Sequence, residues 1–309
     1  MREHVPVLLE ECIEALAINP AGIYVDGTLG RAGHAREIAK KLTSGRLIGI
    51  DRDETAIKTA GESLSSFGNR IILIHGNFRD IETILEKHGN PQVNGMLFDL
   101  GASSPQLDEK ERGFSYTESA PLDMRMDRRE ALTARDIVNT WQEEKLKRIL
   151  WDYGEERYAP RIARGIVKAR EAKEIQTTGE LVDIIRAAMP SAALREKQHP
   201  AKRSFQAIRI AVNDELGAIS DMLEAAVNCL KPGGRLAVIS FHSLEDRLVK
   251  NAINRGEKGC ICPRDFPICA CGFQPTLKAV SRKAITPTER EREENPRARS
   301  AKLRVAQRI

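Results

Sequence analysis

Short apolar runs alternate with stretches of helical spacing along the first hundred residues of the chain. The apolar runs occupy residues 22–25, 46–50, 70–75 and 95–99. Between them, apolar residues recur every three or four positions over 35–42, 54–65 and 81–87. Runs of this length are typical of buried strands, and a helix between successive strands is typical of parallel pairing. The pattern therefore predicts a parallel sheet with helices on its faces.

The alternation stops in the middle of the chain, where no convincing buried strand is found between residues 106 and 203. Helical spacing dominates there instead, over 134–151, 159–173 and 178–189. We interpret 106–203 as a mainly helical insertion that recognises the substrate. The sheet domain is then discontinuous, with residues 1–105 and 204–309.

Sheet-forming patterns return after the insertion. An apolar stripe with three- and four-residue spacing from Phe205 to Leu230 predicts one long amphipathic helix. The sequence Lys231-Pro232-Gly233-Gly234 ends that helix and leads into a strand over 235–241. Residues 276–281 and 302–306 predict two further strands, which we expect to pair antiparallel.

A glycine-rich loop follows the first predicted strand. Gly27, Gly30 and Gly33 lie in DGTLGRAGH (26–34), and Asp51 ends the next strand. Glycines allow the backbone to approach a ligand closely, and an acidic residue at the next strand end suits a ribose. Nicotinamide enzymes and methyltransferases both use this arrangement, so the loop alone does not choose between them.

The strand ends favour a methyltransferase. Asp26, Asp51, Asn77-Phe78 and Asp99 each follow a predicted strand, and ligands of such sheets bind at the carboxyl ends. Carboxylates suit the sulfonium charge of S-adenosylmethionine. Asp99 opens DLGASSPQLD (99–108), whose small residues leave room for a flat base beside the cofactor. The neighbourhood lacks the histidine or Tyr–Lys pair of a hydride-transfer enzyme.

Composition and charge narrow the classes of protein and partner. With 41% hydrophobic and 30% charged residues, the chain is typical of a soluble globular protein. No apolar run approaches the roughly 18 residues of a membrane span, and the N-terminal residues do not resemble a secretory signal. We therefore expect a cytoplasmic protein without disulfides. From Arg282 onwards nine Lys/Arg stand against four Glu, which accounts for the whole net charge of +5. This tail suits a polyanionic partner or, equally, a solvated surface.

The motifs together resemble one family over nearly the whole chain, the bacterial small-subunit ribosomal RNA cytosine-N4 methyltransferases (RsmH, also called MraW). The matching segments are HVPVLLEE (4–11), DGTLGRAGH (26–34), GIDRD (49–53), DLGASSPQLD (99–108), RGFSY (112–116), PLDMRMD (121–127), YGEERYAPRIARGIV (153–167), RSFQAIRIAVNDEL (203–216), LKPGGRLAVISFHSLEDRLVK (230–250) and ENPRARSAKLR (294–304). The resemblance implies a class I, Rossmann-like α/β methyltransferase sheet. It also implies methylation of N4 of a decoding-centre cytidine in 16S rRNA of the small ribosomal subunit, with S-adenosylmethionine as donor.

The same resemblance implies a set of cofactor contacts: Ala32, Gly33, His34, Asp51, Phe78, Asp99 and Gln106. With a cytidine amine as the methyl acceptor, we expect Asp99 to position that amine as well as the cofactor. One departure is visible, because family members often have glycine where this chain has Ala32. A backbone contact would tolerate alanine there, whereas a positive φ would penalise it. Two other classes of function remain open at this point. They are a nicotinamide-dependent oxidoreductase and a non-catalytic RNA-binding protein.

Several further residues have both a functional and a structural interpretation. His242, at the end of the strand over 235–241, would contact the base or be a structural histidine. PLDMRMD would form a lid over the base or a salt-bridged loop. Two CxC pairs, at 260–262 and 269–271, would bind zinc or remain reduced thiols, and we expect no metal. Candidate RNA contacts are Arg161, Arg164 and Lys168 on one face of a predicted helix, with Arg297 and Arg299 in the tail, although a solvated surface is the default for each.

Overall fold

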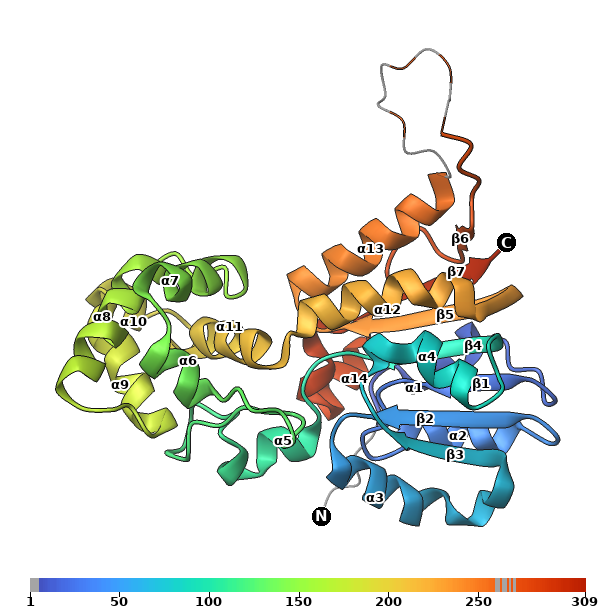
Figure 1. The fold of residues 1–309 in the computed structure, drawn as a ribbon, viewed down its shortest axis with the longest axis horizontal. Coiled ribbons are helices and arrows are strands. Elements are labelled where there is room, and N and C mark those ends of the chain that lie inside the picture. Colours follow the sequence, from blue (N-terminus) through green and yellow to red (C-terminus); the bar gives the residue numbers. More distant parts are fainter. Residues whose placement is uncertain (1–5, 259–261, 263–265, 267, 269–270) are drawn as a thin grey trace. The chain divides into compact units, whose positions relative to one another are not determined.

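The computed structural model describes all residues except 1–5, 259–261, 263–265, 267 and 269–270. The chain forms two compact units (Figure 1). The first unit contains residues 1–101 and 216–309, and the second contains residues 102–215. The predicted first boundary, at 105/106, lies a few residues after the observed one. The predicted second boundary, at 203/204, lies about one helix before the observed one.

The first unit is built on a seven-stranded sheet with the order β3-β2-β1-β4-β5-β7-β6. The five strands on the β3 side of this order run parallel, whereas β7 pairs antiparallel with both β5 and β6. This confirms the predicted parallel sheet and its antiparallel last strands. The strands are β1 (Ile23–Asp26), β2 (Arg46–Asp51), β3 (Ile71–His75), β4 (Val93–Asp99), β5 (Leu230–Ser240), β6 (Leu277–Ala279) and β7 (Lys302–Arg308).

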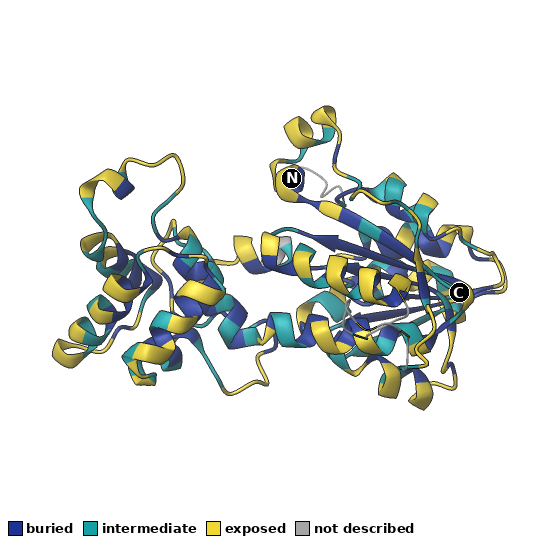
Figure 2. Cartoon of the chain, turned by 90° about the horizontal axis from the view of Figure 1, so that it is seen from above, coloured by how far each residue is buried: buried dark blue, intermediate teal, exposed yellow. Residues whose placement is uncertain are grey.

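Two apolar cores cover the two faces of this sheet. Alternate residues of one strand point to opposite faces, so Val25 and Ile48 enter one core while Tyr24 and Leu47 enter the other. Figure 2 shows the resulting buried sheet between partly exposed helices. The helices of this unit are α1 (Leu9–Ala15), α2 (Gly33–Lys41), α3 (Glu54–Leu64), α4 (Ile81–Lys87), α12 (Glu215–Cys229), α13 (Ser243–Lys258) and α14 (Glu289–Glu294), with 3-10 turns at Ser65–Arg70 (η1), Phe78–Asp80 (η2) and Pro296–Ser300 (η4).

The second unit is helical and has its own apolar core. Its helices are α5 (Ser104–Asp108), α6 (Ala134–Thr140), α7 (Glu143–Asp152), α8 (Ala159–Ala172), α9 (Thr178–Ala188), α10 (Ser191–Leu194) and α11 (Lys202–Asn213), with a 3-10 turn, η3, at Lys110–Arg112. The helix predicted over 134–151 is wrong as one element, since it is broken into α6 and α7 at Trp141, whose backbone is extended.

The long helix predicted from Phe205 to Leu230 is also wrong, because the structure divides it at Asp214. That residue has φ +44°, and α11 ends before it while α12 begins after it. Phe205 and Ile208 pack in the helical core of the second unit, whereas Ile219 packs on the sheet of the first. One uninterrupted apolar stripe in the sequence thus serves two separate cores.

Two expectations concern the membrane and the cysteines. No helix among the described residues is both long and apolar enough to cross a bilayer. Cys12 and Cys229 are buried, and the described cysteines form no disulfide. Cys260 and Cys269 lie outside the described residues, so the zinc or free-thiol alternatives for the CxC pairs stay predictions, as does the cytoplasmic location.

Candidate cofactor and active site

The predicted strand-end residues of the first unit lie at one edge of the sheet. β1 has β2 and β4 as its neighbours, and β5 lies next to β4. The register places Asp26 opposite Gly49 of β2 and Leu97 of β4, and Asp99 opposite Ile239 of β5. Because all four strands are parallel, Asp26, Asp51 and Asp99 end their strands side by side.

Glycines make the loop after β1 compact enough to lie against this edge. A β-carbon at Gly27 would lie 2.2 Å from the Phe98 ring, and one at Gly33 would lie 2.2 Å from Pro6 Cγ. Gly30 has φ +49°, and its N–H donates to Asp51 Oδ2 at 2.8 Å. The loop is therefore held by the strand-end carboxylate that we predicted to bind the cofactor.

Ala32 occupies a left-handed position in the same loop. It has φ +61° and ψ +28° immediately before α2, is fully buried, and donates its N–H to the Leu29 carbonyl at 2.7 Å. A residue with a β-carbon is strained in this region by roughly 1–2 kcal/mol. The position requires positive φ, which explains why glycine suits it better.

Substitutions at Ala32 should separate backbone strain from packing. We expect Ala32→Val to lower the free energy of unfolding by about 2 kcal/mol or more, since a branched, larger side chain is strained at positive φ and overpacks a buried site. Ala32→Gly should change it by less than about 1 kcal/mol, because relieved strain offsets the lost methyl burial. Urea denaturation without cofactor measures both. A valine variant as stable as the parent would contradict the left-handed assignment.

Asp99 has one oxygen in an unusual environment. Its side chain is 27% exposed, yet Oδ1 is buried and has no hydrogen-bond partner among the described residues. Oδ2 lies 4.0 Å from His34 Nδ1, and the Asp99 N–H donates to Thr28 Oγ1 at 2.5 Å. His34 is anchored in turn by a contact of 3.0 Å between Nε2 and the Val7 carbonyl. A buried acceptor without a donor is costly and is typical of a site completed by a ligand.

The carboxyl groups at this edge resist ionisation. Burial raises the pKa of Asp99 to about 8, and the nearby Asp26 and Glu245 charges add to the shift. Burial also raises the pKa of Asp26 to about 7, with a further contribution from Asp51. The pKa of Asp51 is raised by burial, although the N–H groups of Asp53 and Gly30 oppose this. A bound cation would favour the ionised forms of all three groups.

His242 lies directly before α13 and beside Glu245 in the first turn of that helix. Glu245 is fully buried, and its Oε2 accepts the N–H groups of Phe241 at 2.7 Å and His242 at 3.2 Å. The His242 Nε2 lies 3.1 Å from Glu245 Oε1, and Nδ1 accepts the Glu245 N–H at 3.4 Å. Nδ1 is thus hydrogen-bonded to the Glu245 backbone, whereas Nε2 is buried without a hydrogen-bond partner among the described residues. The contact with the base and the structural role therefore both stay predictions. The sequence analysis missed Glu245, whose signal is an acid in the first turn after a strand end.

Phe78 and Gln106 are the two remaining predicted cofactor contacts. Phe78 begins η2 at the end of β3, and its ring packs edge-on against Phe98 with centroids 5.8 Å apart. It therefore supports the ring that lies under Gly27. Gln106 belongs to the second unit, where its Oε1 accepts the Ser103 N–H at 3.0 Å. Its cofactor contact stays a prediction, as does that of every residue in the set.

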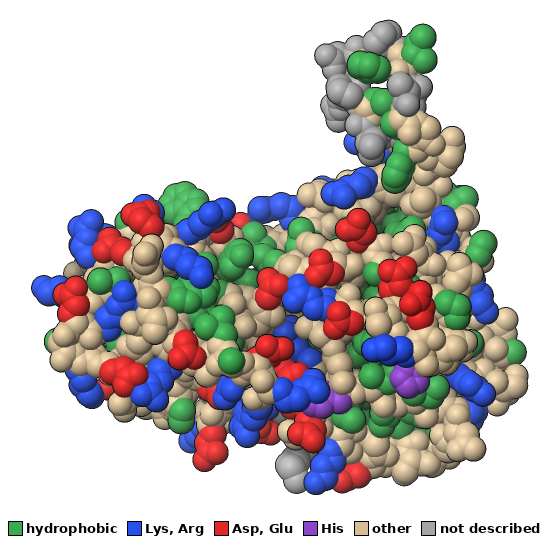
Figure 3. Space-filling view, viewed as in Figure 1, with side chains coloured by type: hydrophobic (Ala, Val, Ile, Leu, Met, Phe, Trp, Pro, Cys, Tyr) green, Lys and Arg blue, Asp and Glu red, His purple; other side chains and the backbone are tan. Residues whose placement is uncertain are grey.

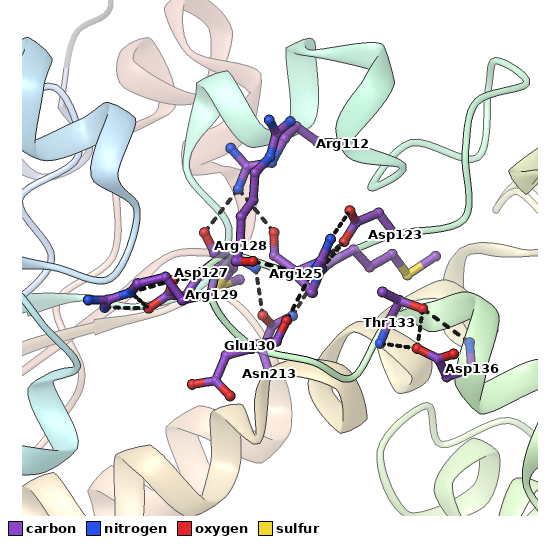
Figure 4. A network of polar contacts seen from close by, with 12 residues as sticks. Arg112, Asp123, Arg125, Asp127, Arg128, Arg129, Glu130, Thr133, Asp136 and Asn213 are labelled. Atoms are coloured by element: carbon purple, nitrogen blue, oxygen red, sulfur yellow. Dashed lines mark hydrogen bonds and ion pairs between the residues drawn. The ribbon is translucent and has the colours of Figure 1, made fainter.

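The PLDMRMD segment is a salt-bridged loop, as one of the two interpretations predicted. Arg125 pairs with Asp123 at 2.7 Å and Arg129 with Asp127 at 2.6 Å. Arg112 is buried and donates to two backbone carbonyls of this loop at 3.0 Å (Figure 4). The sequence analysis missed this role of Arg112, because the contact joins two motifs that are separated along the chain.

The candidate RNA contacts are exposed in both units. Arg161, Arg164 and Lys168 lie on the exposed face of α8, opposite the buried Ile162 and Ile166, as predicted. Arg297 and Arg299 are exposed in η4. Because β7 runs antiparallel to β5, η4 meets the sheet at the edge where Asp99 lies. On the face shown in Figure 3, basic side chains are interspersed with acidic ones.

Comparison with known proteins shows the family of the chain. The MraW methylase family matches residues 1–309. The chain belongs to this family. It is 58% identical over 99% of both chains to "Ribosomal RNA small subunit methyltransferase H" of Acetivibrio thermocellus. It is 56% identical over the full length of both chains to the protein of the same name from Paenibacillus sp. (strain JDR-2).

Family membership confirms the predicted fold class, enzyme class and cofactor. The protein is an S-adenosylmethionine-dependent methyltransferase with a Rossmann-like sheet. The nicotinamide and non-catalytic alternatives are wrong. The site fits the cofactor: the glycine loop gives close backbone approach, and Asp51 offers carboxylate oxygens at the β2 end. The buried Asp99 oxygen also lacks a donor within the described part of the chain. The bound cofactor supplies a methyl group on a positively charged sulfur.

Cofactor binding should depend on pH with a defined sign. The raised pKa values of Asp26 (about 7) and Asp99 (about 8) mean that both groups bind protons near neutrality in the cofactor-free enzyme. Affinity for S-adenosylmethionine should therefore rise with pH through 6–8, by up to about tenfold per unit for each proton released. Calorimetry in buffers of different ionisation enthalpy measures the release. S-adenosylhomocysteine, a neutral thioether at sulfur, should show a weaker dependence, and equal dependence would contradict the sulfonium explanation.

The raised pKa values of Asp26 and Asp99 should make the cofactor-free fold less stable as pH rises, whereas cofactor affinity should increase. A carboxyl whose folded-state pKa lies above its unfolded value favours folding while protonated. The cofactor-free fold should therefore lose stability as pH rises from about 4, and the loss should be complete above about pH 8.

Proposed function

We propose that this methyltransferase transfers a methyl group to the exocyclic N4 amine of a decoding-centre cytidine in 16S rRNA of the small ribosomal subunit. The names of its relatives at 58% and 56% identity support small-subunit ribosomal RNA as the substrate. The resemblance of the motifs supports the cytidine amine. The observation that carries the chemistry is the buried Asp99 Oδ1, which has no donor among the residues that the structure describes.

The chemistry required is activation of a weak nucleophile. The lone pair of the cytosine amine is delocalised into the ring, so it attacks poorly. A carboxylate that accepts a hydrogen bond from the amine localises the lone pair and fixes its direction. Asp99 has that role in the proposal. Its pKa of about 8 in the cofactor-free site falls when a cation binds nearby, so it is an ionised acceptor when needed.

The other residues at this edge of the sheet hold Asp99 and the cofactor in place. Thr28 holds the Asp99 backbone, and His34 lies beside its Oδ2. Glu245 holds the turn after β5, next to the strand that ends in Asp99. The proton released from the amine is acidic once the methyl group is attached, so it leaves to water without a dedicated base.

Incubation with a labelled methyl donor tests the proposal. Small subunits that lack the modification are the substrate, with 16S rRNA extracted from them as a parallel arm. We expect one labelled nucleoside, N4-methylcytidine, at the decoding centre. Label on another nucleoside, or on a different ring atom of cytidine, would overturn the proposal. If transfer occurs in one arm and not in the other, the active arm shows whether the enzyme recognises assembled subunits or free RNA.

A further inference from the structure

The second unit exposes a tryptophan on its surface. Trp151, in the last turn of α7, is 59% exposed, although tryptophan is normally well covered in folded proteins. The chain's other tryptophan, Trp141, is partly covered, and Lys145 Nζ lies 3.5 Å from its ring centroid. An indole left open to solvent is a feature of binding surfaces.

Trp151 lines a groove between α7 and the start of α8. The groove has a volume of about 650 Å³. Its other lining residues include Pro160, the cations Lys145, Lys147 and Arg148, and the acids Glu144 and Asp152. A flat apolar group that entered the groove would therefore meet the indole of Trp151, with Lys145, Lys147 and Arg148 nearby.

The charges beside the groove favour an anionic occupant. The three acids nearby are each paired: Glu144 with Lys147 at 2.5 Å, Asp152 with Arg148 at 3.4 Å, and Glu143 with Arg164 at 3.8 Å. Arg161 and Lys168 extend the same surface along α8. Within the described part of the chain, neither of these two forms an ion pair with a carboxylate. The surface thus keeps a surplus of positive charge.

We propose that this α7–α8 groove binds a single-stranded segment of the RNA substrate, with one base stacked on the indole of Trp151 and neighbouring phosphates on Arg161 and Lys168. The inference rests on the proposed function for RNA as the substrate class. Stacking on an aromatic ring requires an unstacked base, which single strands and loops offer and duplexes do not. An exposed aromatic ring among cations is the arrangement that such binding uses.

Tryptophan fluorescence tests the groove directly. Because the chain has two tryptophans, Trp141→Phe leaves Trp151 as the only reporter. We expect a single-stranded RNA oligonucleotide to quench this fluorescence, and a duplex of the same sequence to quench it much less. In the parent chain, Trp151→Ala should weaken single-strand binding about tenfold, with Trp151→Phe retaining most of the affinity. Phe273→Ala removes a 43% exposed aromatic ring in the first unit and should have no effect.

The phosphate contacts have a separate readout. Replacing Arg161 and Lys168 together by glutamine should reduce the slope of log affinity against log salt by about 1.4, or about 0.7 for each phosphate of a single strand. In methyl transfer, Trp151→Ala should raise KM for RNA without changing kcat or the affinity for the methyl donor. These readouts distinguish an RNA surface from a groove that binds a protein, for which RNA would cause no quenching.

Failure of this inference differs from failure of the proposed function. Unchanged RNA affinity in Trp151→Ala, or absence of quenching by single strands, would overturn the groove while methyl transfer by the parent chain continued. If the parent chain bound RNA with quenching but formed no N4-methylcytidine, the groove would stand and the proposed reaction would be wrong.

Discussion

Replacing Asp99 with alanine is expected to lower methyl transfer by at least about a hundredfold, while the protein stays folded. The carboxyl is the acceptor that we assign to the amine, and its Oδ1 is buried without a hydrogen-bond partner among the described residues. Burial already disfavours its charge, as the raised pKa of about 8 indicates. Removal of the group should therefore leave the cofactor-free fold as stable as before, or more stable above pH 8.

Transfer measured with saturating cofactor and RNA separates the chemical step from binding. Asp221→Ala is a matched control, because Asp221 is an exposed aspartate of the same unit that pairs with Arg79 at 2.8 Å. Its transfer rate should equal that of the parent chain. Asp99→Asn keeps one carbonyl oxygen and should retain more activity than alanine. Near-normal turnover by Asp99→Ala would remove Asp99 from the mechanism.

Replacing Asp51 with alanine is expected to weaken S-adenosylmethionine binding by about 10- to 100-fold. Two effects contribute. The cofactor loses the acceptor that strand ends of this kind offer to a ribose. The glycine loop also loses its anchor, because Asp51 Oδ2 accepts the Gly30 N–H at 2.8 Å and Oδ1 accepts the Asp53 N–H at 2.9 Å.

The neighbouring aspartate supplies the control for this prediction. Asp53 accepts the Thr55 N–H at 3.1 Å as the N-cap of α3. Asp53→Ala should lower the free energy of unfolding by about 1 kcal/mol with a smaller effect on affinity. Calorimetric titration with the cofactor compares the two variants, and thermal unfolding monitors the fold. Equal affinity losses for both would mean that Asp51 acts through loop stability alone.

The sequence by itself determined the sheet, the position of the glycine loop and the row of strand-end acids. Strands and helices of a parallel sheet differ in local period, and each strand leads directly into the loop that carries its functional residue. Asp26, Asp51 and Asp99 were therefore identifiable from short segments. The motifs were also long enough to indicate the family, which the full-length match confirmed.

Only the tertiary structure decided how these residues are used. The left-handed backbone of Ala32 and the Asp99 oxygen that has no donor among the described residues each depend on the surrounding tertiary structure. The break at Asp214 likewise depends on which core each half of the apolar stripe enters. Periodicity shows that a residue is buried, but burial alone does not specify its partners, and the partners set its conformation, its charge and its chemistry.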